Sequence, residues 1–315
     1  QGTADPWTEL PCPLPDEDHL DAYTGRRTVE WINNYSDEKP FYLQVLFPGP
    51  HDPFDSPASY RAMYKPEEMS VGSMEMPREP VPDNVKFVLK WSGLEGKLTR
   101  EDKQLMSTFY YAKITLIDEY IGKIVKALEE KNMLDNTWII YTSDHGEMLG
   151  DHMMSHKIVF YEGALRIPLI IRPPGGTQGW KTAALADHLD HPATMIDIAG
   201  ASPLENCDGR SLKQQVLAGP DAADSQKGKD YVFSEVFAFS MIRDNRYKLA
   251  FDTRNNQPGE LFDLENDPDE DQNLITDPAY EGIVKDLQEA YERQMADRLD
   301  QEKLDTAVAA MGKRR

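Results

Sequence analysis

The pair Asp144 and His145 gives the sequence its strongest chemical signal. Both residues follow directly on 137–142 (TWIIYT), an apolar, β-rich run that predicts a buried strand. A carboxylate oxygen beside an imidazole nitrogen is a ligand pair suited to a divalent cation. Gly146 permits a tight turn that would aim both side chains at one point. The alternative is that Asp144 caps a helix N-terminus while His145 faces solvent.

Lys157 and His51 could bind an anionic group beside such a cation. Lys157 lies a short way beyond Asp144, in a stretch that holds two more histidines. His51 follows a second apolar run, 40–47 (PFYLQVLF), and prolines on both sides make its position rigid. Ammonium and imidazole groups grip anions well. Each residue also has a simpler interpretation, since a lysine is usually a solvated surface charge and a loop histidine is usually exposed.

Two other groups of residues resemble functional motifs, but each lacks a residue that its motif requires. Asp263, Glu265 and Asp267 alternate as in an EF-hand, yet Pro268 stands where that calcium loop needs glycine, which predicts a solvated acidic turn. Ser234 lies in no Gly-x-Ser-x-Gly elbow, so a serine triad is not expected.

The predicted elements around Asp144, His145, Lys157 and His51 are typical of an α/β sheet. In such sheets, ligands bind beyond the carboxyl ends of the strands. Thr99 and Asp102 form a capping box ahead of a long apolar stripe that continues to about Leu128, which predicts a long helix. The stretch from 55 to about 96 shows little periodicity. The other expected elements are helices at 23–35 and 193–199 and strands at 40–47, 137–142 and 165–172.

From about Asp230 the pattern changes to short strands with tight turns, which predicts a small antiparallel sheet covered by one helix. We expect strands at 231–237, 240–243, 247–251 and 261–264 and a helix over about 280–300. The predicted organisation is one α/β domain at 1–212 and a small α+β domain at 213–315.

Composition excludes several classes of protein. The 315 residues are 40% hydrophobic and 28% charged, so the chain can bury a sizeable core. The formal net charge of −21 disfavours nucleic acid as a partner. Cys12 and Cys207 are too few for a disulfide framework, and no apolar run is long enough to span a membrane. No signal peptide is visible at Gln1, and the compartment stays open.

The chain resembles the sulfatase family of the alkaline phosphatase superfamily. The resemblance covers nearly all 315 residues and rests on segments that stand in the family's order. They are 47–54 (FPGPHDPF), 141–152 (YTSDHGEMLGDH), Lys157, 166–171 (RIPLII), 190–200, 208–212 (DGRSL), 243–249 (RDNRYKL) and 260–268 (ELFDLENDP).

The resemblance implies a fold and a role for each candidate residue. The fold would be the alkaline-phosphatase-like mixed sheet flanked by helices, with a smaller carboxyl-terminal domain. Asp144 would bind a divalent cation, typically Ca²⁺ with Mn²⁺ or Zn²⁺ as alternatives, and His145 would be the adjoining ligand where many members have Asn. Lys157 would contact the sulfate and its bridging oxygen, and His51 would help to protonate the departing alcohol.

One part of the family pattern is missing. Sulfatases carry a Cys- or Ser-x-Pro-Ser-Arg segment whose first residue becomes formylglycine, the covalent nucleophile, and neither Cys12 nor Cys207 lies in such a segment. We therefore expect this sequence to be the carboxyl-terminal portion of a longer enzyme, with about half of the expected metal shell.

The resulting hypothesis is a sulfuric ester hydrolase acting on a small-molecule or carbohydrate sulfate ester. Two alternatives stay open. His145, with the segment that follows it, also resembles phosphonate monoester and phosphodiester hydrolases of the same superfamily, and a fragment without the nucleophile could be catalytically inactive. The sequence does not reveal the ester, the metal or the oligomeric state.

Overall fold

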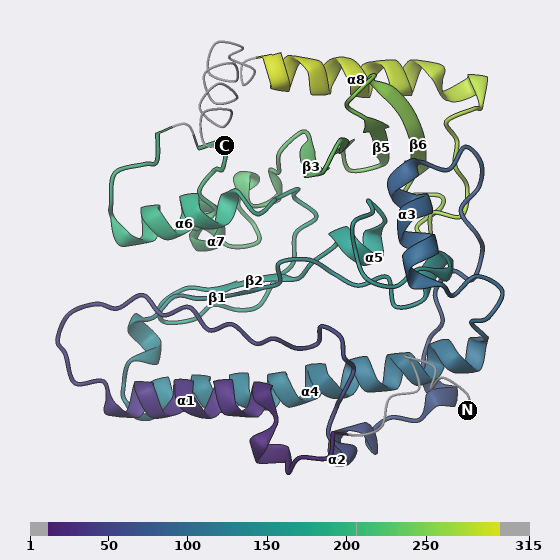
Figure 1. Cartoon of the computed structure of the whole chain (residues 1–315). Helices are drawn as coiled ribbons and strands as arrows, with labels where there is room; N and C mark the ends of the chain where they lie inside the picture. Colours follow the sequence, from purple (N-terminus) through teal and green to yellow (C-terminus); the bar gives the residue numbers. More distant parts are fainter. Residues whose placement is uncertain (1–11, 206, 297–315) are drawn as a thin grey trace, which may run out of the picture.

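Helices and two separate antiparallel sheets make up the part of the chain that this computed structural model describes, residues 12–205 and 207–296 (Figure 1). The α-helices are α1 (Leu20–Asn34), α2 (Ala58–Arg61), α3 (Asp83–Ser92), α4 (Arg100–Glu130), α5 (Glu162–Leu165), α6 (Asp190–Ala199), α7 (Lys213–Ala218) and α8 (Glu281–Ala296). The strands are β1 (Ile139–Thr142), β2 (Leu169–Arg172), β3 (Val232–Val236), β4 (Phe239–Arg243), β5 (Tyr247–Asp252) and β6 (Gln257–Asp263). Short 3₁₀ helices lie at Asp16–Asp18, Pro66–Glu68, Leu134–Asn136, Asp151–Met153, Ala223–Gln226 and Pro278–Tyr280.

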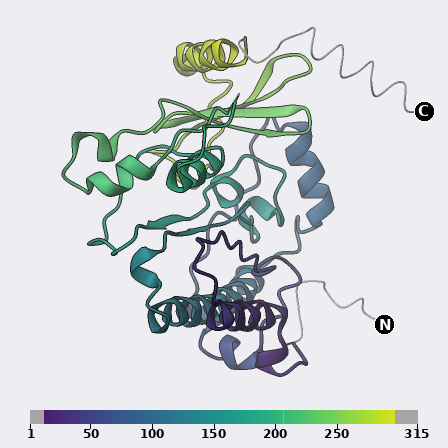
Figure 2. The same cartoon turned by 90° about the vertical axis from the view of Figure 1, so that its left-hand side faces the viewer.

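The long helix α4 forms one layer with α1, and the two lie side by side (Figures 1 and 2). The predicted capping box is confirmed, because Thr99 Oγ1 accepts from the Asp102 backbone N–H and the Asp102 carboxylate accepts from the Thr99 N–H. Leu116 and Tyr120 on the α4 stripe pack against Ala22 of α1 in a buried cluster. None of the helices described is long and apolar enough to cross a membrane.

The strands β1 and β2 form a two-stranded antiparallel pair above this helical layer (Figure 1). They are shorter than the predicted strands, since α5 takes the chain as far as Leu165 and β2 begins only at Leu169. The expectation that 137–142 is buried was wrong: Tyr141 is 36% exposed and its partner Ile170 is 62% exposed.

The predicted strand at 40–47 is not a strand in the structure. It runs extended with alternating burial, and Phe41 and Leu43 pack near Ile32, whereas Tyr42 and Leu46 are exposed. No strand in the described residues pairs with it. A strand needs a neighbour for its backbone N–H and C=O groups, which an apolar sequence alone does not supply.

Helix α3 was missed by the sequence interpretation. It is only ten residues long, begins directly after Pro82 and ends at Gly93, whose φ of 63° is the left-handed cap conformation. Val85 and Val88 pack with Met148 and Met154 in a buried cluster beneath the loop that carries Lys157. Its short apolar stripe is part of the core that supports this loop.

The carboxyl-terminal sheet agrees closely with the prediction. Strands β3 to β6 pair antiparallel in chain order, and α8 covers one face (Figure 1). Leu287 of α8 packs on Leu249 and Leu261 in a buried cluster. The predicted end of this helix, 297–300, lies outside the described residues. The predicted division into domains at 212/213 stays a prediction.

The expectation of a solvated acidic turn was wrong for Asp263, whereas Glu265 of the same turn is 67% exposed. Asp263 is only 2% exposed, and Arg246 donates to both of its carboxylate oxygens, at 3.0 and 2.7 Å. Hydrogen bonds from Arg246 hold the pKa of Asp263 down at about 2. The carboxylate is therefore a structural partner of the β4–β5 turn and not a calcium ligand.

Candidate active site

Lys157 and His51 contact each other directly. Lys157 Nζ lies 2.6 Å from His51 Nε2. The other ring nitrogen of His51 lies 2.8 Å from the carbonyl oxygen of Asp52 and 3.0 Å from its Oδ1, so Nδ1 carries the proton and Nε2 accepts from the ammonium. A cation and an imidazole nitrogen thus meet at one point on the surface.

The loop that carries His51 is held from below by α4. Lys113 Nζ donates to the carbonyl oxygens of His51 and Pro53 and to Asp55 Oδ1, each at 3.0 Å. The Lys113 side chain is 6% exposed, so its charge is neutralised by these three acceptors and not by water. Lys113 therefore fixes the backbone on both sides of Asp52.

The loop that carries Lys157 has a constrained backbone. His156 and Ile158, on either side of Lys157, have φ angles of 69° and 82°, a region that costs a β-branched residue free energy. The ring of His156 stacks on Trp91 of α3 at 4.5 Å between centroids. Glu147 accepts from the His156 backbone N–H, which anchors the loop from the other side. Burial raises the pKa of the Glu147 carboxyl.

Asp144 and His145 lie just beyond β1, as the sequence predicts. His145 Nδ1 lies 2.8 Å from the Gly146 carbonyl oxygen and donates to it, so Nε2 is free to act as a ligand. That Nε2 lies 3.5 Å from Asp144 Oδ2. His188 Nε2 donates to the Ser143 carbonyl oxygen at 2.9 Å and so braces the residue before Asp144.

The two pairs face each other. The ring centroids of His51 and His145 are 6.0 Å apart, in an edge-on arrangement. The structure therefore brings together all four residues that the sequence singled out, from two segments far apart in the chain. The helix-cap alternative for Asp144 does not apply, because no α-helix begins there.

Gly146 acts through close packing and not through an unusual backbone angle. A Cβ at this position would lie 2.1 Å from the Gly163 carbonyl oxygen. Gly146 N–H donates to the Ala164 carbonyl at 2.8 Å, and Glu147 N–H donates to the Gly163 carbonyl at 2.9 Å. Because no side chain fits between these backbones, only glycine allows the segment after His145 to dock on α5.

The donor set fits part of a metal centre. An oxygen and a nitrogen 3.5 Å apart can share one divalent ion. Among the residues that the structure describes, no third His, Cys, Asp or Glu joins Asp144 and His145. The Asp144 side chain is also 84% exposed. Two ligands on one open side are fewer than the six to eight oxygens that calcium takes.

The residues that hold the His51 and Lys157 loops in place were not predicted from the sequence. Lys113 lies in the apolar stripe of the predicted long helix and Asp52 in the segment 47–54, and neither has a predicted role. Asp52 Oδ1 lies 3.0 Å from His51 Nδ1 and 3.5 Å from His156 Nδ1, and thus between the two loops. A lysine inside an apolar stripe was the available signal for Lys113, since lysine is rarely buried without partners.

Comparison with known proteins identifies the family. The sequence model described as "Sulfatase" matches residues 3–201, and that described as "N-sulphoglucosamine sulphohydrolase, C-terminal" matches residues 150–297. The chain belongs to the sulfatase family. Sulfatases are hydrolases of the alkaline phosphatase superfamily, and they generally use a metal ion and a formylglycine. The resemblance and the fold class expected from the sequence are confirmed.

Relatives of this sulfatase-family chain are similar over most of its length. It is 30% identical to the multifunctional alkaline phosphatase superfamily protein PehA of Trinickia caryophylli, over 89% of this chain and 60% of that protein. It is 29% identical to an arylsulfatase of Clostridium perfringens, over 87% of this chain and 57% of that protein. The phosphonate monoester hydrolase of Agrobacterium radiobacter has a similar solved structure, with 25% identity and a TM-score of 0.77 over 94% of this chain and 64% of that one. The chain thus spans about 60% of the length of these relatives.

Proposed function

We propose that this chain carries part of the active site of a sulfuric ester hydrolase. The observation that supports the proposal most strongly is the contact between Lys157 and His51 beside His145. An ammonium, an imidazole and a candidate metal pair within one small region are what cleavage of an anionic ester needs. The substrate class would be a small-molecule or carbohydrate sulfate ester. A choline-sulfatase of Rhizobium meliloti, 30% identical over 78% of this chain, supports a small-molecule substrate.

Lys157 and His51 would act on the departing side of the ester. The Lys157 ammonium would bind a sulfate oxygen and the bridging oxygen, where negative charge grows as the bond breaks. His51 Nε2 accepts from Lys157 in the structure. With the Lys157 ammonium turned to the ester oxygens, a protonated His51 would give its Nε2 proton to the leaving alcohol as a general acid. The Asp52 carbonyl oxygen, which accepts from Nδ1, would hold the ring in that orientation.

Asp144 Oδ2 and His145 Nε2 would hold a divalent ion. We propose Ca²⁺, with Mn²⁺ or Zn²⁺ as the alternatives that an imidazole ligand admits. When bound, the ion would neutralise charge on the ester oxygens, and a formylglycine would supply the nucleophile. In this proposal residues 1–212 belong to the catalytic α/β domain and residues 213–315 form the small carboxyl-terminal domain.

A second candidate activity is hydrolysis of phosphonate monoesters or phosphodiesters. Phosphonate monoester hydrolases of Agrobacterium radiobacter and Silicibacter pomeroyi both have similar structures, each with 25% identity and a TM-score of 0.77. Parallel measurement of kcat/KM for an aryl sulfate and an aryl phosphonate monoester, with the protein encoded by the whole reading frame, separates the two activities. A preference for the phosphonate would replace the leading proposal by this one.

The Asp144→Ala and Lys157→Ala variants test the site. Asp144→Ala should abolish turnover and lower the content of bound metal in the whole protein, measured by elemental mass spectrometry. Lys157→Ala should lower kcat by about 10²-fold or more, with an unchanged melting temperature. Lys285→Ala, at a lysine of α8 whose side chain is 75% exposed, is the control and should keep full activity.

Intact mass analysis of the same protein tests formylglycine conversion. A reading frame with no Cys- or Ser-x-Pro-Ser-Arg segment, together with no turnover of either ester, would overturn the enzyme proposal in favour of an inactive fragment. Full activity of either alanine variant would remove that residue from the site.

A further inference from the structure

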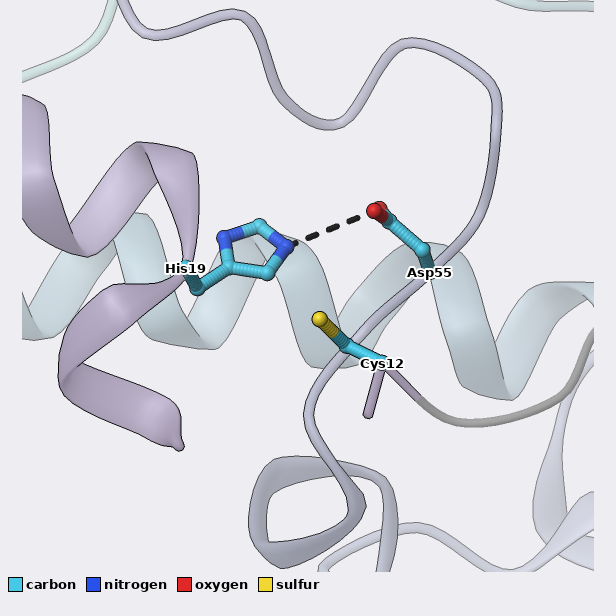
Figure 3. A group of neighbouring side chains, drawn as sticks. All are labelled: Cys12, His19 and Asp55. Carbon is cyan, nitrogen blue, oxygen red and sulfur yellow. Dashed lines mark ion pairs between the residues drawn. The ribbon is translucent and has the colours of Figure 1, made fainter. Parts of the chain in front are cut away.

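A second group of ligand-type side chains lies at the amino-terminal end of α1 (Figure 3). It consists of Cys12, His19 and Asp55, and their ligand atoms all lie within 4.8 Å of one another. Cys12 comes from the segment before α1, His19 is the residue that caps α1, and Asp55 lies in the loop after Pro53. None of the three takes part in the site of Asp144 and His145.

His19 is the buried member of this group. Its side chain is 3% exposed, and Nε2 has no hydrogen-bond partner. Figure 3 shows that nitrogen directed at Asp55, whose Oδ1 lies 3.5 Å away, with the sulfur of Cys12 beside the two. Burying a polar ring nitrogen without a hydrogen bond costs free energy, so an unpartnered one that faces two ligand-type groups indicates a missing partner.

Asp21 lies behind the imidazole, on the side of Nδ1. Its carboxylate is 1% exposed, Oδ1 accepts from the Gly49 backbone N–H, and Oδ2 has no hydrogen-bond partner. That Oδ2 lies 3.5 Å from His19 Nδ1. In the structure Nδ1 accepts from the Asp21 backbone N–H at 3.3 Å. A cation bound at Nε2 would require the ring proton on Nδ1, where the unpartnered Asp21 Oδ2 could accept it, as a carboxylate does behind many metal-binding histidines.

The charges of the group fit a divalent ion. A Cys12 thiolate and the carboxylates of Asp21 and Asp55 are negative, whereas Lys113, whose Nζ is 3.0 Å from Asp55 Oδ1, is positive. One dication would neutralise the remaining negative charge, and buried charges need such neutralisation. Asp55 Oδ1, which lies 3.5 Å from His19 Nε2, is the carboxylate oxygen that faces the imidazole.

We propose that Cys12, His19 and Asp55 bind Zn²⁺. Thiolate, imidazole and carboxylate are the three ligand types that zinc takes in proteins, at about 2.0 to 2.3 Å, and water would fill the fourth position. Tetrahedral ligands at these bond lengths lie roughly 3.3 to 3.7 Å apart. The 3.5 Å between His19 Nε2 and Asp55 fits this spacing, and a small rotation of the Cys12 side chain would bring the sulfur into range.

The ion would connect the segment before α1 to the loop that carries His51. The backbone already links them once, because Cys12 N–H donates to the Ser56 carbonyl oxygen at 3.3 Å. A metal bound by both segments would restrict them further, and its binding free energy would add to folding stability. This role is separate from the proposed catalytic metal and does not depend on the proposed hydrolase activity.

Cobalt substitution tests the zinc site through its sulfur ligand. Titration of the metal-free protein with Co²⁺ should produce a thiolate-to-cobalt charge-transfer absorption that saturates at one equivalent, and excess Zn²⁺ should remove it. Cys12→Ser should abolish the band. Cys207→Ser is the matched control, since it removes the other cysteine and should leave the band unchanged. Asp144→Ala should also retain it, which distinguishes this site from the catalytic one.

Asp21→Asn tests the residue behind the imidazole and should weaken Zn²⁺ binding about 10- to 100-fold, measured by competition with a chelating dye. Zn²⁺ should raise the melting temperature of the wild type and of Cys207→Ser but not of Cys12→Ser. No charge-transfer band in the wild type, or a band that survives Cys12→Ser, would overturn the proposal.

Discussion

Lys157 Nζ lies 2.6 Å from His51 Nε2, although 106 positions separate the two residues in the chain. A separate hydrogen bond fixes the backbone at each residue. Lys113 donates to the His51 carbonyl oxygen, and Glu147 accepts from the N–H of His156, the residue before Lys157. The contact therefore depends on two loops that are fixed independently, and it is sensitive to changes in either support.

The proposed general acid makes a prediction about leaving groups. His51→Ala should lower kcat about 10²- to 10⁴-fold for an alkyl sulfate, whose alkoxide leaves poorly without a proton. It should have a much smaller effect for 4-nitrophenyl sulfate, because that leaving group needs little protonation. Steady-state kinetics with both esters on the whole enzyme would check this. An equal loss for the two substrates would mean that His51 does not donate the proton.

Lys113→Met should destabilise the fold. The substitution leaves the Asp55 carboxylate and two loop carbonyls without their donor, at a cost of about 2 kcal/mol. Lys123→Met is a suitable control on the same helix, because its pair with Glu119 is about half exposed and should contribute less than about 1 kcal/mol. Urea denaturation of both variants measures the difference. Similar midpoints would show that Lys113 does not hold the His51 loop.

Gly146→Ala should be among the most damaging small substitutions near the site. Its Cβ would meet the Gly163 carbonyl oxygen at 2.1 Å, and two backbones must separate to make room, at a cost of more than about 2 kcal/mol. Gly122→Ala, in α4 with open space around it, should instead stabilise the helix by about 0.5 to 1 kcal/mol. Thermal melts of the two variants should shift in opposite directions, and a shift in the same direction would contradict the packing argument.

Glu260 should make stability depend on pH. It is 2% exposed, and burial raises its pKa from 4.5 to about 7, against the hydrogen bond from Tyr161 that favours ionisation. A carboxyl with a raised pKa in the folded state stabilises the fold below its unfolded pKa, and that contribution is lost as the pH rises through the folded value. The free energy of unfolding of the wild type, relative to Glu260→Gln, should therefore fall between pH about 4.5 and about 7. A difference that does not change across this range would rule out the raised pKa.

Features that depend on neighbouring residues could be predicted from the amino-acid sequence alone. The capping box at Thr99, the strands of the carboxyl-terminal sheet, and the position of Asp144 and His145 after a strand all follow from spacing within a few residues. Such local preferences act wherever the chain is, because they need no distant partner. The family motifs could be recognised for the same reason.

Contacts between groups far apart in the chain depend on tertiary packing. Packing of α4 beneath the His51 loop and of α3 beneath the Lys157 loop brings His51 to Lys157, and a local pattern does not encode that distance. The segment 40–47 failed as a strand because pairing needs a second strand. The neighbours of Asp263 and Cys12 also come from other parts of the chain. Burial and charge neutralisation depend on which residues the fold packs against a side chain.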